Sequence, residues 1–183
     1  MPEITTLTAW KPKSLAKGRV LSLDLGARTG WAFAENGKLV DSGVHALFDA
    51  KYRNFTDGER FHAFYEFLMR YDTVDAIVFE QVAGGTKGRQ TVLFNGYRAT
   101  LLLWAQMLCV PVIPLAVGTI KKAVTGSGHA SKEDVIDAVR AMGYPTFDDN
   151  EADAIAAYFA AKSIDTRQEI VYSDLDITGD DDD

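Results

Sequence analysis

The sequence predicts an α/β protein with one mixed sheet of five strands, three antiparallel and then two parallel, flanked by helices on both faces. Three observations support this. Strand and helix signals alternate along the chain, Asn36-Gly37 is a strong hairpin signal between two short apolar runs, and residues 75–82 form the β-branched run of a strand covered on both faces. A chain of 183 residues, 47% of them hydrophobic, can bury one core of ordinary size.

Periodicity and turn residues assign the elements in order. The first strand alternates apolar residues and ends at a glycine turn, and the first helix repeats apolar residues at spacings of three and four. Right-handed crossovers place the strand at 75–82 parallel to the first strand and beside it. The expected strands are 19–25, 31–36, 38–42, 75–82 and 110–117, and the expected helices are 57–71, 90–108 (buried), 119–124, 131–141 (capped by Ser131) and 150–162.

Composition divides the chain into an N-terminal arm (1–18), a folded domain (19–163) and an acidic tail (164–183). Six of the acidic residues fall within 174–183, so the net charge of -7 comes almost entirely from the tail. Residues 81–132 carry six basic residues and no acidic ones. This asymmetry predicts a positive face suited to a polyanion, although buried helices also lack acids. The tail either aids solubility or mimics DNA.

Cysteine and hydropathy indicate where the chain functions. Cys109 is the single cysteine, so no intramolecular disulfide forms, and a reducing cytoplasm is expected. No apolar run is long enough to span a bilayer, and the first residues lack a signal-peptide pattern. We therefore expect a cytoplasmic protein with no membrane partner.

Carboxylates lie at the predicted carboxyl ends of two neighbouring strands. Asp24 ends the first strand, and Glu80 lies near the end of the strand at 75–82. Asp153 and Asn150 share one face of the last helix. These hard oxygen ligands suit Mg²⁺ or Mn²⁺. The alternatives are an Asx-turn at Asp24, a salt bridge at Glu80 and a helix N-cap at Asn150.

Four segments together resemble the RuvC family of Holliday junction resolvases: VLSLDLGARTGWA (20–32), VFEQV (78–82), IKKAVTGSGHASKEDV (120–135) and EADAIA (151–156). The resemblance covers residues 19 to 163. It implies an RNase H-like fold, a homodimer, and a magnesium-dependent endonuclease that nicks opposed strands of a four-way DNA junction. It also implies two metal ions per active site, with Mn²⁺ as a substitute for Mg²⁺, and a bacterial cell, whether the gene is cellular or viral.

The resemblance also assigns roles to single residues. Asp24, Glu80 and Asp153 match the metal-binding acids, and Lys121 or Lys122, together with Lys132, match lysines that face the DNA near the scissile phosphate. In the predicted catalytic set we place Asp24, Glu80, Asp153, Asn150, Lys122 and Lys132. Asn150 stands where the family usually has Asp or His, so the neighbouring Asp149 is an alternative ligand.

The segment after Glu80 also departs from the family. The family often has an aromatic residue here that wedges into the junction, whereas this chain has Ala83-Gly84-Gly85. Lys87 and Arg89 nearby are expected to contact DNA backbone phosphates, as are Lys121, Lys122 and Lys132. We expect His129 to be a loop residue, and Phe94 and Trp104 to lie in the core or at a dimer contact.

Two other functions remain open on the sequence. An Asp-x-Gly turn before a hairpin also begins the sugar-kinase and actin-like ATPases, but those enzymes need two lobes and this chain has room for one. A protein of the same fold that binds branched DNA without cutting it is also consistent with the replacement at Asn150.

Overall fold

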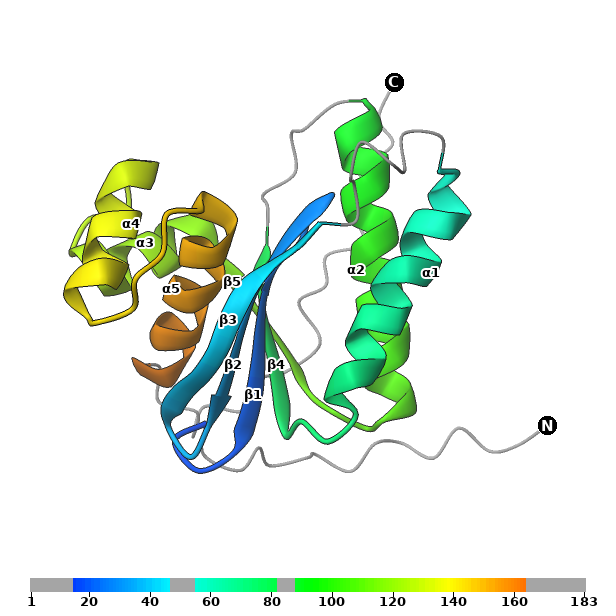
Figure 1. The fold of residues 1–183 in the computed structure, drawn as a ribbon, viewed down its shortest axis with the longest axis horizontal. Coiled ribbons are helices and arrows are strands. Elements are labelled where there is room, and N and C mark those ends of the chain that lie inside the picture. The colour runs from blue at the N-terminus through cyan, green and yellow to red at the C-terminus, as the bar shows by residue number, and fades with distance from the viewer. Residues whose placement is uncertain (1–14, 47–54, 82–87, 164–183) are drawn as a thin grey trace, which may run out of the picture.

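The computed structural model describes residues 15–46, 55–81 and 88–163. A five-stranded mixed sheet lies at the centre, in the order β3-β2-β1-β4-β5, with helices on both faces (Figure 1). The strands are β1 (Arg19–Asp24), β2 (Arg28–Glu35), β3 (Lys38–Ala46), β4 (Ala76–Gln81) and β5 (Val112–Ala116). The helices are α1 (Asp57–Leu68), the 3-10 turn η2 (Met69–Tyr71), α2 (Arg89–Met107), α3 (Val117–Thr125), α4 (Lys132–Ala141) and α5 (Asp149–Ser163).

The predicted sheet is confirmed, including the hairpin between its second and third strands. Asn36 and Gly37 both have positive φ, 51° and 77°, as the tight primed turn requires. Both strands are longer than predicted, since β2 begins at Arg28 and β3 continues to Ala46. Gly30 and Gly43 interrupt the strand pattern at these ends, but antiparallel pairing carries the two strands on together until Arg28 is opposite Ala46.

The parallel pairing of β1 with β4 is also as predicted. Leu21 is in register with Ile77, and Leu23 with Phe79. One residue further along each strand lie Asp24 and Glu80. The pairing therefore brings two carboxylates to the same edge, at the carboxyl ends of adjacent parallel strands.

Alternating side chains of the sheet supply two cores. One lies under α3, α4 and α5 and includes Val20 and Val78, and the other lies under α1 and α2 and includes Leu21 and Leu23. Leu15, in the predicted N-terminal arm, is buried in the first core. The acidic tail from residue 164 lies outside the described residues. In the part that the structure does describe, no helix has the length and apolar character that crossing a membrane requires.

Helix α2 differs from the expectation of a buried helix. Its inner face buries Tyr97, Leu101 and Trp104, which confirms Trp104 as a core residue, while Phe94 is partly buried against the same core. Its outer face exposes apolar side chains, with Leu103 and Met107 each 63% exposed. The prediction was wrong because a helix that is apolar on every side does not reveal which face is covered.

Helix α5 lies unusually close to the sheet, and Gly30 is the reason. Gly30 on β2 is paired with Asp24 on β1. A Cβ atom built on Gly30 would lie 1.8 Å from the carbonyl oxygen of Asn150, in the first turn of α5. Only glycine leaves room for this approach, so the bare backbone of β2 allows the start of α5 to lie beside the end of β1.

We expect Gly30→Ala to destabilise the fold by about 1–3 kcal/mol, because an added methyl group must push α5 from the sheet. Urea unfolding followed by circular dichroism measures this. Gly58→Ala on α1 is the control, since only the Thr56 hydroxyl, at 4.0 Å, lies near the new methyl. A stability of Gly30→Ala equal to that of the wild type would contradict the close approach.

Candidate active site

The three predicted acids share one electrostatic environment at the carboxyl edge of β1 and β4. Burial is the main cause that raises the pKa of Asp24 to about 8, and the charges of Glu80, Asp153 and Asp149 raise it further. Two of these three neighbours come from the first turns of α5, far away in sequence. The prediction that distant segments bring Asp24, Glu80 and Asp153 together is therefore supported by the structure.

Glu80 and Asp153 show the same effect. Burial, followed by the charge of Asp153, raises the pKa of Glu80 to about 7, while Lys121 and Lys132 lower it. Burial also raises the pKa of Asp153, again opposed by Lys132 and Lys121. Half-buried carboxylates that lie close together repel one another when they are ionised. A bound cation would relieve this repulsion.

The acids surround a common region without forming a closed metal cage. Among the described residues, no group of three or more His, Cys, Asp or Glu side chains is arranged to hold a metal ion. The donor set nevertheless suits a hard divalent cation, since it consists of carboxylate oxygens. The mutual repulsion of Asp24, Glu80 and Asp153 is what a divalent charge would relieve.

The start of α5 corrects the reading of Asn150. The helix begins at Asp149, and the carbonyl of Asp148 accepts the N–H of Ala152. The side chain of Asp148 accepts the N–H of Asn150 at 3.0 Å and its amide Nδ2 at 2.9 Å. The N-cap is thus Asp148 and not Asn150. The Nδ2 of Asn150 also donates to Asp149 at 3.2 Å. The amide oxygen of Asn150 therefore points away from the carboxylates of Asp148 and Asp149.

Two lysines face the acids, and one predicted lysine does not. Lys132, the first residue of α4, is paired with Asp149, and its charge lowers the pKa of Asp24. Lys121 donates to the carbonyl of Ala130 at 2.6 Å, and its charge lowers the pKa of Glu80 and Asp153. Lys122 is exposed and acts on none of these three acids. Adjacent helical residues point about 100° apart, which explains why only Lys121 faces the site.

The remaining predicted residues lie further out or outside the described part. Arg89 begins α2 and pairs with Asp57 of α1 at 2.6 Å, with 64% of its side chain exposed. Lys87 and Ala83-Gly84-Gly85 fall outside the described residues. His129 is exposed in the turn before α4, as expected of a loop residue.

The sequence reasoning missed five residues around the start of α5. Arg28 pairs with Asp148 at 2.5 Å, and Glu151 accepts hydrogen bonds from Ser42 and Thr146. An Asp before a helix is a strong N-cap signal that could have identified Asp148. No signal in the sequence joins Arg28 or Ser42 to residues more than 100 positions away.

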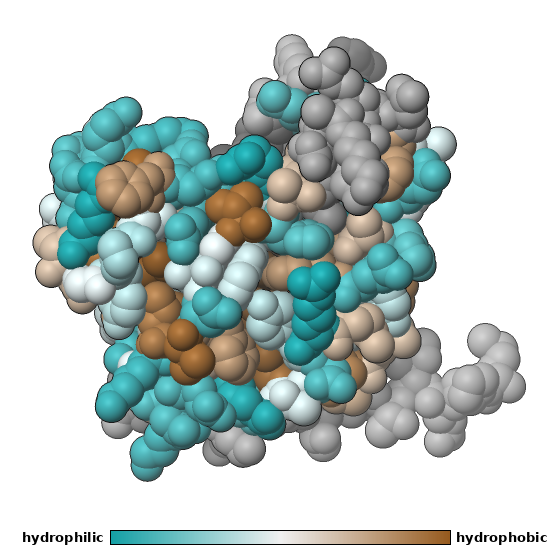
Figure 2. Space-filling view, in the orientation of Figure 1, coloured by the Kyte–Doolittle hydropathy of each residue, from teal (hydrophilic) through white to brown (hydrophobic). Residues whose placement is uncertain are grey.

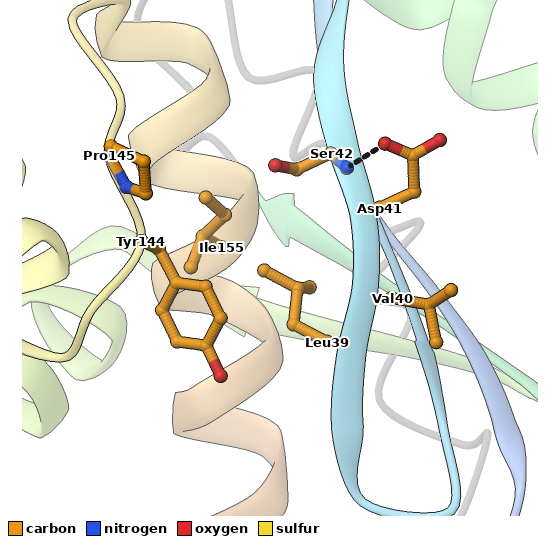
Figure 3. A pocket seen from close by; sticks show the side chains of 7 residues that line it. All are labelled: Leu39, Val40, Asp41, Ser42, Tyr144, Pro145 and Ile155. Carbon is orange, nitrogen blue, oxygen red and sulfur yellow. Dashed lines mark hydrogen bonds between the residues drawn. The ribbon is translucent and has the colours of Figure 1, made fainter.

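A pocket of about 230 Å³ lies on another side of α5, between β3 and the segment that follows α4 (Figure 3). Its lining mixes apolar and polar groups and consists of Leu39, Val40, Asp41, Ser42, Tyr144, Pro145 and Ile155. None of the three acids lines it. Figure 2 shows apolar residues reaching the surface along this seam between β3 and α5.

The raised pKa values predict how the stability of the metal-free protein depends on pH. The folded state holds these protons more tightly than the unfolded chain, where the pKa is near 3.8 for an Asp carboxyl and near 4.5 for a Glu carboxyl. The free energy of unfolding therefore falls as pH rises from about 4 to about 8. In EDTA at pH 8, Asp24→Asn should be more stable than the wild type by at least about 1 kcal/mol. Thermal unfolding at pH 5 and pH 8 measures this, and a wild-type Tm that does not fall would contradict it.

Known proteins resemble this chain in both sequence and structure. No family model matches it. The crossover junction endodeoxyribonuclease RuvC of Trichlorobacter lovleyi is 32% identical over 146 residues, covering 75% of this chain and 81% of that protein. RuvC of Ehrlichia ruminantium (strain Welgevonden) is 29% identical over 142 residues, covering 70% and 86%.

Solved structures share the RNase H-like fold. Thermus thermophilus RuvC in complex with a Holliday junction substrate has a TM-score of 0.65 at 23% identity, covering 78% of this chain and 92% of that one. The yeast mitochondrial Holliday junction resolvase Ydc2 has a TM-score of 0.56 at 14% identity, covering 80% and 78%. With one curated relative above 30% identity over three quarters of the chain, the protein belongs to the RuvC family of crossover junction endodeoxyribonucleases.

Proposed function

We propose that this protein is a structure-selective endonuclease that resolves four-way (Holliday) or branched DNA junctions by metal-dependent hydrolysis of phosphodiester bonds. The observation that carries the proposal is the convergence of Asp24, Glu80 and Asp153 at one edge of the sheet, where each acid has a raised pKa. Membership of the RuvC family supplies the substrate class. Its curated relatives are bacterial, and we place the protein in the cytoplasm of a bacterial cell.

Nucleases of this family generally depend on a divalent metal, and we propose Mg²⁺, with Mn²⁺ as a substitute and two ions per site. Asp24, Glu80 and Asp153 would hold the ions through carboxylate oxygens, and Asn150 would add its amide oxygen. Such ions activate a water molecule and neutralise charge on the leaving oxygen of the phosphodiester. The half-buried position of the acids strengthens each of these charge interactions, since less water screens them.

The lysines complete the site with positive charge. Lys121 and Lys132 already act on the acids, and the same amines would stabilise charge that develops on the scissile phosphate. Lys122, which is exposed on α3, would contact a neighbouring backbone phosphate together with Lys87 and Arg89. Backbone contacts of this kind orient the DNA without reading its sequence.

A homodimer fits this reaction, because symmetric cleavage of a four-way junction requires two active sites. The outer face of α2 supports this proposal. Val92, Leu103 and Met107 lie on one side of the helix and are each more than half exposed. Apolar surface of this kind is typical of contacts between subunits. The alternative, a silent binder of branched DNA, is not favoured because Asp24, Glu80 and Asp153 are all retained.

Cleavage assays with synthetic DNA test the proposed activity. With Mg²⁺ or Mn²⁺, we expect paired nicks near the crossover of a four-way junction and none in a linear duplex of the same sequence. Asp24→Asn should lower the rate at least about 100-fold while junction binding persists, because Asp24 would hold the metal ions and is not among the residues that would contact the DNA backbone. Binding without cleavage by the wild type would refute the nuclease and restore the silent binder.

A second assay distinguishes the two adjacent lysines of α3. Lys121→Ala should reduce the cleavage rate at saturating DNA by about 10- to 100-fold, because Lys121 faces the acids. Lys122→Ala should weaken binding of all DNA sequences alike and lower the slope of log affinity against log salt by about 1. Single-turnover cleavage and salt titrations of binding measure the two effects. The reverse pattern would assign the catalytic role to Lys122.

A further inference from the structure

Small side chains form most of the contact between α5 and the sheet. The buried face of this helix consists mostly of alanines, namely Ala152, Ala154, Ala156, Ala157, Ala160 and Ala161. Small side chains let the helix come close, but they interlock less with the sheet than large ones do. The pocket between β3 and the segment before α5 removes further contact on this side. Hydrogen bonds at the first turn add directional restraint to this packing.

Glu151 makes these bonds with both of its carboxylate oxygens. Ser42 on β3 donates its hydroxyl to Oε1 at 2.7 Å, and Thr146 donates its hydroxyl to Oε2 at 2.6 Å. Figure 3 shows the Ser42 side chain pointing from β3 towards α5, whereas its neighbour Asp41 points the other way. The carboxylate therefore bridges an edge strand and the segment that leads into α5.

The donors themselves are well held. Thr146 is only 2% exposed, and its carbonyl accepts a hydrogen bond from the Nε of Arg140 at 2.8 Å. Its hydroxyl also accepts the N–H of Asp148 at 3.3 Å, beside the N-cap of α5. The hydrogen-bond partner Thr146 is therefore itself held in place. Its bond to Glu151 restrains the position of the helix.

Glu151 does not belong to the acidic cluster itself. On a helix it lies about 200° from Asp153, so Glu151 faces β3 while Asp153 faces Asp24 at the carboxyl edge of β1. The charges that raise the pKa of Asp24 are those of Glu80, Asp153 and Asp149, and Glu151 is not among them. Its role must therefore be exerted through the position of the helix.

We propose that Glu151 is a positioning residue whose bridge to Ser42 and Thr146 sets the first turn of α5 so that Asp153 and Asn150 meet Asp24 and Glu80 correctly. This inference rests on the proposed function in its link to cleavage, although its effect on metal binding is independent of it. Residues that orient metal ligands from outside typically change metal affinity or activity by about 10- to 100-fold.

The test compares full-length variants in two measurements. The first is the Kd for Mn²⁺, from titration of the metal-free protein followed by electron paramagnetic resonance of free Mn²⁺. The second is the single-turnover rate of four-way junction cleavage at saturating DNA. Glu151→Ala should raise the Kd and lower the rate, each by about 10-fold or more. Junction binding in Ca²⁺ should stay within about 3-fold of the wild type.

Two variants separate positioning from charge and from folding. Glu151→Gln should stay within about 3-fold of the wild type, because an amide can accept one hydroxyl and donate to the other. Ser42→Ala removes one donor from β3 and leaves the helix unchanged, so it should show a smaller effect in the same direction. It also carries the test if Glu151→Ala does not fold. Glu133→Ala in the first turn of α4 is the matched control, since it removes the same charge from a similar helix position.

Wild-type Mn²⁺ affinity and cleavage in both Glu151→Ala and Ser42→Ala would overturn the proposal. A loss in Glu151→Gln equal to that in Glu151→Ala would overturn it as well, since charge would then be responsible. If the wild type binds Mn²⁺ but does not cut the junction, the proposed nuclease activity is refuted. The Mn²⁺ titration of the variants then still tests the positioning role of Glu151. A wild type that binds no Mn²⁺ would overturn both.

Discussion

The parallel pairing of β1 with β4 brings the first two acids of the site side by side. Its register places Asp24 and Glu80 one residue beyond Leu23 and Phe79, at the same edge of the sheet. Two half-buried carboxylates at neighbouring strand ends oppose each other's ionisation, and Asp153 adds a third charge. The fold retains this unfavourable arrangement because apolar side chains of the same strands fill a core on each face of the sheet. Perturbed carboxylates of this kind are typical of functional sites.

A second constraint determines how the last helix reaches this edge. Gly30 lets the backbone of α5 approach β2 directly, since any side chain at that position would overlap the Asn150 carbonyl. Alanines continue the close contact along the helix. Hydrogen bonds around the first turn then restrict movement of the helix along the sheet. Arg28 donates to Asp148, and Ser42 donates to Glu151. The small residues allow the helix to pack close to the sheet, and the hydrogen bonds define the position of its first turn.

Charge is balanced locally around the acids. Lys132 and Lys121 come from α4 and α3, two short helices on the same side of the sheet as α5 (Figure 1), and both oppose the effects of burial on the acids. The chain as a whole is acidic, yet these amines come from the stretch that lacks Asp and Glu. The lysines beside the acids therefore come from a stretch of the chain that is itself positive, although the net charge of the whole chain is negative.

The strand order, the hairpin at Asn36-Gly37 and the meeting of Asp24 with Glu80 could be predicted from the sequence, because they follow from local turn chemistry, hydrophobic period and the handedness of crossovers. The helix that carries Asp153 could be predicted in the same way. Three features could not: the cap of this helix is Asp148 and not Asn150, Lys121 faces the acids while Lys122 faces solvent, and α2 leaves an apolar side exposed. Each of these depends on which side of an element meets a neighbour from a distant part of the chain, and a one-dimensional pattern does not contain that information.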